Sequence, residues 1–368
     1  MGRRTPLLAL LLVAVGCHHQ PTPQPALRSA GLELLLQTEA QFYRDDRLCA
    51  DAIVDGQPTA HAAHCWPASM HLSALCAAAK VDRSWRRRLD EYITAMDAHR
   101  PAGGGYDASA YPPKPDRYHD DNAWMALALL EAYGLSGDAE HLARAKTALS
   151  FALAGEDSTL GGGIWWRESE RKSKHACSVA PTIVACLRMY RIGGDRRYLE
   201  SAERLTEWIE KTLRDPADGL YFDHVRIDGT IDRVKFSYNS ALMIAARCAW
   251  FDVTDDLRHL GHARRIADAA TRRWVVLWPM AARGAIRDDA FFAAWLVEAL
   301  LELYRRDGDS RWHAAAVAAV TFVARRNADP AGWRPAKWDA IPTAPLRTVR
   351  LIDQSAAVRA MLLTDIIR

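Results

Sequence analysis

The sequence lacks the features that mark several large classes of protein. Its charges nearly cancel, with 48 lysines and arginines against 45 aspartates and glutamates, so it has no basic surplus of the kind that binds nucleic acid. No glycine-rich phosphate loop follows a strand, and no serine or cysteine nucleophile has a convincing base. No alternating apolar pattern is long enough to build a sheet core. We therefore expect neither nucleic-acid binding, nor nucleotide binding, nor acyl-enzyme chemistry.

Long hydrophobic runs are scarce, and the run near the start is too short to span a membrane. Residues 7–15 are apolar, follow two arginines and precede Gly16-Cys17, which is typical of a secretory signal. Because the cysteine resembles a bacterial lipoprotein cleavage box, we expect residues 1–17 to be a signal peptide with Cys17 as the lipidated residue. Residues 18–28, rich in proline and glutamine, would form a tether. We expect an exported protein held at the cell envelope, with the outer membrane favoured, by this lipid anchor alone; a plain signal peptide cut nearby is the alternative.

Cysteine is not abundant in the rest of the chain, but its number is even. An even number in an oxidising compartment permits disulfides, and the sequence does not set their pairing. Cys177 and Cys186 lie nine residues apart on one predicted helix and so face opposite sides, which excludes a bond between them. The six cysteines are Cys49, Cys65, Cys76, Cys177, Cys186 and Cys248.

A repeated unit organises the chain. An aromatic residue followed five positions later by aspartate recurs every 54 to 60 residues, ending at Asp138, Asp195, Asp255 and Asp309. One unit further back falls near Asp82. The segment before each aspartate is apolar all round, which predicts a buried helix, and the segment after it is amphipathic and charged, which predicts an outer helix. A period of this length indicates helix pairs that are stacked or arranged in a ring.

The pattern predicts a closed ring of helix pairs. Outer helices follow the first five inner helices, and the N-terminal segment 31–45 supplies the outer partner of the sixth. Six inner and six outer helices closed in this way form an all-α (α/α)6 barrel, which we expect to be one domain over residues 29–368. The predicted starts of the inner helices lie near Trp66, Asp121, Ser178, Asn239, Asp289 and Ile352.

The lengths of the connections predict which face of the barrel is functional. Turns from an inner to an outer helix are short and carry turn and cap residues. Connections from an outer helix to the next inner helix are long and aromatic, and all of them rise where the inner helices begin. Long loops in a compact domain are usually functional. We therefore expect the site at this face.

A pair of aspartates stands at this face, where residues 118–124 read Tyr-His-Asp-Asp-Asn-Ala-Trp. Taken alone, acidic side chains at a helix start are usually caps. Only one of Asp120 and Asp121 can cap, however, and paired carboxylates are what glycosidases use, since one protonates the leaving oxygen while the other attacks. Neighbouring Cα atoms lie about 3.8 Å apart, which suits the roughly 5 Å between the carboxyls of a retaining enzyme.

Several motifs together resemble one known family. They are the block at 118–124, residues 127–133, Gly137-Asp138, residues 161–166 (Gly-Gly-Gly-Ile-Trp-Trp), residues 219–223 (Gly-Leu-Tyr-Phe-Asp) and Tyr238-Asn239. This set is similar to glycoside hydrolase family 76, the bacterial and fungal α-1,6-mannanases, over most of the chain from about Trp66 onward. The resemblance implies an (α/α)6 barrel with a catalytic aspartate pair. By the family pattern, Asp120 would be the nucleophile and Asp121 the general acid/base.

The chain departs from the family pattern at three places. Val179 stands where an asparagine is frequent, Ser240-Ala241 where the family often has Gln-Gly, and Phe292-Ala293 where it usually has Lys-Gly. Each change removes a polar group from the barrel mouth and leaves the aspartate pair intact. The resemblance therefore implies a divergent member with altered substrate subsites.

Further residues are candidates for substrate binding. They are Asn122, Trp124, Trp165, Trp166, Tyr238, Asn239, Asp288 and Asp289. Indole rings stack on the apolar faces of sugars, and we expect one of Trp165 and Trp166 to pack inward. Asn239 has a helix cap as its alternative role. Asp288 and Asp289 could bind hydroxyls, form an inverting pair with the first two aspartates, or cap their own helix.

One further tryptophan and one cluster of histidine and cysteine residues are not assigned to the site. Trp66 is assigned to the core. His61, His64 and Cys65 are residue types that bind metals, but such a cluster without a second half is usually incidental. We therefore expect neither a metal nor a cofactor.

The sequence predicts a retaining glycoside hydrolase that acts on α-mannosidic linkages of an oligo- or polysaccharide, in the manner of an endo-α-1,6-mannanase. One alternative is another sugar enzyme on the same barrel, of the unsaturated glucuronyl hydrolase or epimerase type. The other is a glycan-binding lipoprotein without activity. The sequence does not determine the oligomeric state.

Overall fold

The computed structural model describes residues 27–114, 116–277 and 279–367. The predicted signal peptide, Cys17 and the tether as far as residue 26 lie outside these residues. Among the described residues, no helix is long and apolar enough to cross a membrane.

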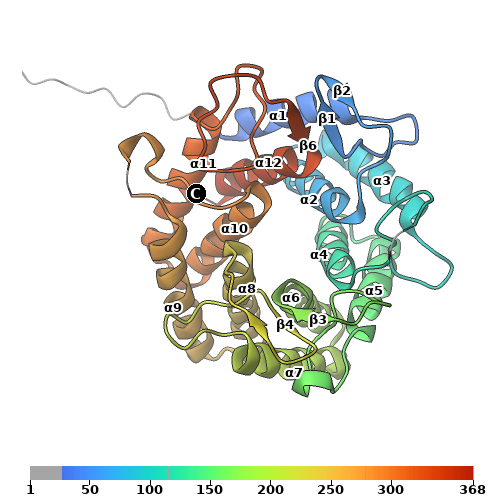
Figure 1. The fold of residues 1–368 in the computed structure, drawn as a ribbon, viewed down its shortest axis with the longest axis vertical. Coiled ribbons are helices and arrows are strands. Elements are labelled where there is room, and N and C mark those ends of the chain that lie inside the picture. Colours follow the sequence, from blue (N-terminus) through green and yellow to red (C-terminus); the bar gives the residue numbers. More distant parts are fainter. Residues whose placement is uncertain (1–26, 115, 278, 368) are drawn as a thin grey trace, which may run out of the picture.

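The described α-helices form two concentric rings (Figure 1). The inner ring consists of α2 (Cys65–Val81), α4 (His119–Ser136), α6 (Ala176–Gly193), α8 (Ser237–Thr254), α10 (Ala290–Asp307) and α12 (Leu351–Ile366). The outer ring consists of α1 (Leu27–Phe42), α3 (Arg86–Ala95), α5 (Ala139–Ala154), α7 (Arg196–Thr212), α9 (Leu257–Trp274) and α11 (Ser310–Arg325). Short 3₁₀ turns cover Arg83–Trp85, Met96–His99, Thr159–Gly161 and Met280–Ala282.

Each inner helix packs against its two inner neighbours and has its most extensive outer contact with one helix of the outer ring. The inner contacts run from α2 through α4, α6, α8 and α10 to α12, and α12 returns to α2. The outer partner of α12 is α1, from the opposite end of the chain. This confirms the predicted (α/α)6 barrel, and every inner helix begins within two residues of its predicted start.

The short turns between inner and outer helices use the same capping chemistry. Asp138, Asp195 and Asp309 each accept a hydrogen bond from the backbone N–H two residues later and so cap the outer helix that follows. In the α8–α9 turn the predicted cap is wrong by one residue. Asp256 caps α9, while Asp255 takes the left-handed position, with φ 55°, that glycine occupies in the other three turns.

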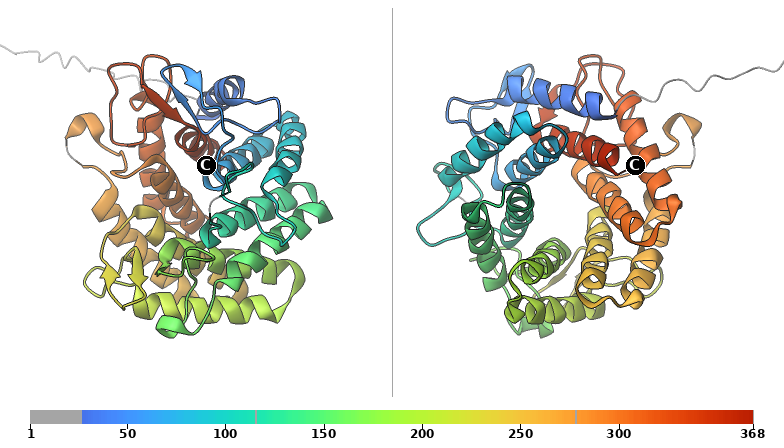
Figure 2. Two further views of the ribbon diagram at one scale, coloured as in Figure 1. Left: turned by 45° about the vertical axis from the view of Figure 1, so that its right-hand side comes forward. Right: turned by 180° about the vertical axis from the view of Figure 1, so that it is seen from behind.

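Two contacts close the ring between the ends of the chain. Helix α1 packs closely on α12, because a Cβ atom on Gly31 would lie 2.9 Å from Cδ2 of Leu362. At the other end of α12, strand β6 (Thr348–Arg350) pairs antiparallel with β1 (Ala52–Val54), which also pairs with β2 (Gln57–Pro58). Figure 2 shows the N-terminal and C-terminal helices side by side from two further directions.

A second small sheet connects two of the long loops. Strand β4 (His224–Arg226) pairs antiparallel with β3 (Ser173–His175) on one side and with β5 (Ile231–Asp232) on the other. Because β3 runs directly into α6, this sheet lies at the face where the inner helices begin. The strands are two or three residues long and contribute no layer to the core, as the sequence predicts.

All six cysteines among the described residues are buried and free. Cys177 and Cys186 therefore do not pair, as predicted. The disulfides that export permits are not formed here, because these thiols are spread over the packed interior instead of being brought together in pairs.

The other end of the barrel is held by a buried ion-pair network. The Arg359 guanidinium on α12 lies 2.9 Å from Glu131 of α4 and 2.8 Å from Glu298 of α10. Burial alone would raise the pKa of Glu131, but Arg359 and Lys80 lower it to about 2. Three inner helices are therefore tied together at this end.

Candidate active site

A pocket of about 670 Å³ opens at the face where the inner helices begin. The first turns of all six inner helices contribute side chains to it. The barrel thus brings together residues that are up to about 300 positions apart in the sequence, from Asp51 to Ile352. This is the face that the long loops predict to be functional.

Asp120 and Asp121 lie in the first turn of α4 and both line the pocket. The N-cap of α4 is Tyr118, and no side chain caps this helix. The capping interpretation is therefore wrong for both aspartates. Asp120 is half-buried and Asp121 is buried, with 7% of its surface exposed.

Several donor groups lie near the carboxyl group of Asp120. The Cys177 thiol donates a hydrogen bond to its Oδ2 over 3.4 Å, and the Trp166 indole N–H and the backbone N–H groups of Asp120 and Asp121 are close enough to lower its pKa. Its other oxygen, Oδ1, is buried. Burial raises the pKa of Asp120 to about 6, and the nearby donor groups oppose that rise because they stabilise the carboxylate.

The environment of Asp121 disfavours its ionised form more strongly. Burial raises its pKa well above the usual value for aspartate, and the neighbouring negative charge of Asp120 raises it further. Two carboxyls that share a site cannot both ionise easily. The donors lie around Asp120, so Asp120 ionises first and Asp121 keeps the proton.

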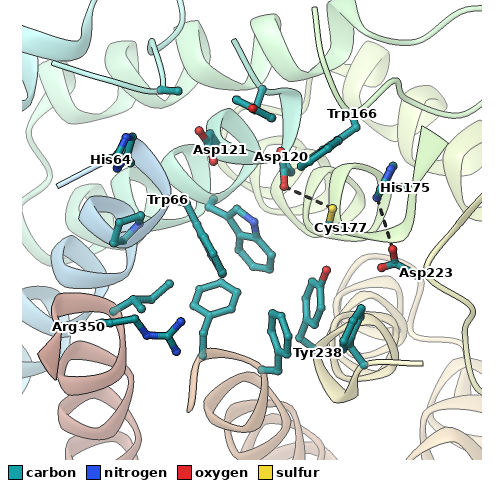
Figure 3. A pocket seen from close by; sticks show the side chains of 18 of the residues that line it. His64, Trp66, Asp120, Asp121, Trp166, His175, Cys177, Asp223, Tyr238 and Arg350 are labelled. Carbon is teal, nitrogen blue, oxygen red and sulfur yellow. Dashed lines mark hydrogen bonds and ion pairs between the residues drawn. The ribbon is translucent and has the colours of Figure 1, made fainter. Parts of the chain in front are cut away.

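Three of the predicted substrate-binding residues line the pocket. They are Trp124, Trp166 and Tyr238. Trp166 stands next to Asp120 (Figure 3), and its ring lies edge-on to Tyr118 with the centroids 5.1 Å apart. Trp165, by contrast, is buried, and its indole donates to Asp157 over 2.6 Å. One tryptophan of this pair therefore packs inward, as expected.

Asn122 also lies behind the pocket wall. Its Oδ1 accepts the backbone N–H of Tyr106 over 2.7 Å, and its Nδ2 donates to the carbonyls of Tyr106 and Tyr118. These bonds fix the loop before α4 to the start of that helix. Asn122 and Trp165 thus hold the loops that carry the site, at positions from which they do not line the pocket.

Three more of the predicted residues, all in the second half of the barrel, also lie behind the pocket wall. Asn239 is fully buried and lies 3.4 Å from Asp223, while Phe236, not Asn239, is the N-cap of α8. Asp288 accepts the backbone N–H of Ser237 over 2.7 Å, and Asp289 forms an ion pair with Lys337. None of the three lines the pocket, which leaves no inverting partner for the first pair among them.

The profile of the family described as Glycosyl hydrolase family 76 matches residues 37–303, more than half of the chain. The chain belongs to glycosyl hydrolase family 76. It is therefore a glycoside hydrolase by family, as the resemblance of its motifs implies.

Solved structures and a curated relative agree with this assignment. The family 76 α-mannanase BT2949 of Bacteroides thetaiotaomicron is 25% identical, with a TM-score of 0.83 over 91% of this chain and 94% of its own. An inactive variant of the α-1,6-mannanase GH76A of Salegentibacter sp. HEL1_6, solved with α-1,6-mannotriose, shares the fold with a TM-score of 0.80 at 20% identity, over 93% of this chain and all of its own. The mannan endo-1,6-alpha-mannosidase DCW1 of Candida glabrata is 29% identical over 120 residues. That match spans 30% of this chain and 27% of the length of DCW1.

An aromatic wall faces the acids in this family 76 chain, and the sequence assigned part of it wrongly. Trp66 was expected in the core, but it is 36% exposed and lines the pocket. It stacks with Phe292, which in turn stacks on Tyr238 with centroids 4.3 Å apart. Phe292 near the start of α10 was the signal for this wall, since it stands where the family pattern usually has a lysine.

A histidine–aspartate group borders the pocket and was also not predicted as such. Asp223 Oδ2 lies 2.8 Å from His224 Nδ1 and 3.7 Å from His175 Nδ1. These residue types can hold a metal ion. However, the two imidazole rings are stacked within 11° of parallel at 4.3 Å, so their in-plane lone pairs do not converge on one point. The geometry fits a hydrogen-bonded group at the pocket edge.

The polar residues at the far rim come from the two ends of the family 76 barrel. The His64 ring lies 3.4 Å from Asp51, and Arg350 is held by two 2.8 Å hydrogen bonds to the buried Asp353. His64 was regarded in the sequence as part of an incidental cluster, and the structure pairs it with Asp51 instead. These side chains meet because β1 and β6 bring their segments together.

Proposed function

We propose that the chain is a retaining glycoside hydrolase of α-mannosidic linkages, acting on α-1,6-mannan in the manner of an endo-mannanase. The observation that carries the proposal is the adjacent pair Asp120 and Asp121 in one pocket, one favoured as carboxylate and the other as acid. Support comes from the α-mannanase and α-1,6-mannanase relatives. In the inactive relative bound to mannotriose, two consecutive aspartates are replaced by asparagine.

In the first step, the Asp120 carboxylate attacks the anomeric carbon of the bound mannose. The new C–O bond forms as the glycosidic C–O bond breaks, and its electron pair goes to the leaving oxygen. Asp121 donates its proton to that oxygen. The raised pKa of Asp121 serves this step, because it favours the protonated form from which the acid donates.

In the second step, Asp121 is a carboxylate and acts as the base. It takes a proton from a water molecule whose oxygen attacks the anomeric carbon, and the bond to Asp120 breaks. Two displacements return the sugar to its original anomeric configuration. Asp120 leaves as a carboxylate and Asp121 is protonated again, so the pair is ready for the next substrate.

The catalytic roles of Asp120 and Asp121 can be tested by measuring the rate of hydrolysis. With linear α-1,6-mannan, the wild type should release reducing ends, and Asp120→Asn and Asp121→Asn should each lower the rate at least about a thousandfold. Asp138→Asn is the matched control, because asparagine caps a helix as well as aspartate does and Asp138 lies in a turn at the other end of α4. Full activity in either pocket variant would refute the assignment.

Proton NMR of the first product tests the stereochemistry, and an initial β-anomer from an α-mannoside would refute retention.

The family match favours hydrolysis over the epimerase and unsaturated glucuronyl hydrolase alternatives. Mannan binding without turnover by the folded wild type would identify the glycan-binding alternative.

We also propose, from the sequence alone, that the chain is exported and lipidated at Cys17. Mass spectrometry of the protein from bacterial membranes should find acyl groups on Cys17. A mature protein that begins elsewhere and lacks acyl groups would contradict the proposal.

A further inference from the structure

The carboxyl oxygen of Asp120 that faces the pocket has an unusual partner. Its Oδ2 accepts a hydrogen bond from the Cys177 thiol over 3.4 Å, whereas Oδ1 is buried (Figure 3). Cys177 lies in the first turn of α6, next to α4 in the inner ring. A thiol on the neighbouring helix therefore contacts the oxygen that would attack the substrate.

The thiol itself has a second neighbour. The Tyr238 hydroxyl, on the next inner helix α8, is close enough to Cys177 to influence the pKa of the thiol, so the contacts run from Tyr238 through Cys177 to Asp120. Figure 3 shows this hydroxyl directed toward the sulfur. The Tyr238 ring is fixed by its stacking on Phe292, which limits the positions that the hydroxyl can take.

We propose that Tyr238 and Cys177 are positioning residues that orient Asp120 and favour its carboxylate form. The inference rests on the proposed role of Asp120 as nucleophile. Three consecutive inner helices supply one group each. The position of the attacking oxygen is therefore set by the packing of three helices and not by its own helix alone.

The chemistry of sulfur fits this role. A thiol is a weak donor, and its hydrogen bond is longer than that of a hydroxyl. It can stabilise the carboxylate while leaving Oδ2 a lone pair for attack. Burial and the charge of Asp120 raise the pKa of Cys177 well above the usual thiol value, so the group stays protonated and remains a donor.

The first test replaces Cys177 and follows activity against pH. Cys177→Ala should lower kcat about tenfold, as expected for a lost hydrogen bond to a charged group, with KM within about twofold. Because a bond that stabilises the carboxylate is lost, Asp120 ionises less readily and the acid limb of the profile should move to higher pH. Cys177→Ser keeps a donor and should restore the position of that limb.

Cys186→Ala is the matched control. Cys186 is a buried, free thiol on the same helix and does not line the pocket. Its variant should keep the wild-type profile. An unmoved acid limb in Cys177→Ala, or equal losses in the alanine and serine variants, would reduce Cys177 to a packing residue and overturn the proposal.

The second link is tested through Tyr238. Tyr238→Phe keeps the stacked ring and removes the hydroxyl, so it should shift the acid limb in the same direction as Cys177→Ala but by less. In the double variant the two shifts should not add, because Tyr238 acts through Cys177. Additive shifts would show that Tyr238 acts by another route and would overturn that link.

A measurement without substrate separates this inference from the proposed function. Aspartate labelled with ¹³C at the carboxyl carbon allows Asp120 to be titrated by NMR, with its signal assigned by its loss in Asp120→Asn. The midpoint should rise in Cys177→Ala and return in Cys177→Ser, whether or not any mannan is cleaved. A wild type without turnover but with this shift would reject the proposed substrate and keep the positioning role; an unchanged midpoint would reject the role itself.

Discussion

At the scale of single residues, the two buried carboxyl groups of the pocket lower the stability of the folded protein. Asp120 and Asp121 are desolvated side by side, and the raised pKa of each shows that the folded state disfavours their charge. The folded protein therefore binds protons in a pH range where the unfolded chain has released them. Stability must then fall as pH rises from the unfolded pKa, near 3.8, toward the folded one.

The Asp121→Asn variant should show this directly. Asparagine cannot ionise, so the variant avoids the cost of burying a second carboxylate. Its Tm should equal or lie slightly below that of the wild type near pH 4, and the difference should grow in its favour toward pH 8. Thermal unfolding at several pH values checks this, with Asp138→Asn as the exposed control. A difference independent of pH would mean that Asp121 is not protonated in the folded state.

At the scale of helices and turns, the sequence already contained most of the information. Apolar periodicity predicted the helices, and a recurring aspartate predicted the caps, because both are local signals. The β-strands could not be predicted in this way. Strands of two or three residues carry no period of their own, and β1 pairs with β6 only because the ring brings together segments almost 300 residues apart.

The α8–α9 turn gives a prediction at this scale. Asp255 adopts a left-handed conformation that glycine adopts in the three equivalent turns. Asp255→Gly should therefore stabilise the protein, by up to about 1 kcal/mol, since relief of backbone strain exceeds the entropy that glycine adds to the unfolded chain. Chemical denaturation would measure it.

The neighbouring residue provides the contrast for that measurement. Asp256→Ala removes the cap of α9 and should cost about 1 kcal/mol. If Asp255→Gly is as destabilising as Asp256→Ala, Asp255 makes a contribution other than its backbone conformation.

At the scale of the whole molecule, closure of the ring determines what the site contains. The sequence named Asp120, Asp121, Trp166 and Tyr238 from local motifs, and all four line the pocket. It missed Trp66 and the contact of Cys177 with Asp120, since whether a side chain at a helix start points inward depends on how neighbouring helices pack. Asn122 and Trp165 were named for their place in a motif, and the assembled barrel uses them to hold loops.

Closure itself can be tested at Gly31. A side chain there would press on Leu362 and on Met361, whose Cβ lies 3.2 Å from the added atom. Gly31→Val should destabilise the fold by about 1 to 3 kcal/mol, the usual cost of overpacking. Gly193→Ala is the control, because a Cβ at this last residue of α6 meets nothing within 4 Å. Equal denaturation midpoints for both variants would mean that the α1–α12 contact accommodates the valine side chain without loss of stability.

The position of α1 also determines which end of the barrel lies nearest to the start of the described chain. The Arg28 side chain hydrogen-bonds to the carbonyl of Val81, the last residue of α2, whereas Trp66 in the first turn of that helix lines the pocket. The two ends of α2 lie about 24 Å apart at 1.5 Å per residue. Helix α1 therefore begins at the end of the barrel opposite the pocket. If Cys17 is lipidated, as we propose, we expect the pocket to face away from the membrane, toward glycans in the surroundings and not toward those in the anchoring lipid layer.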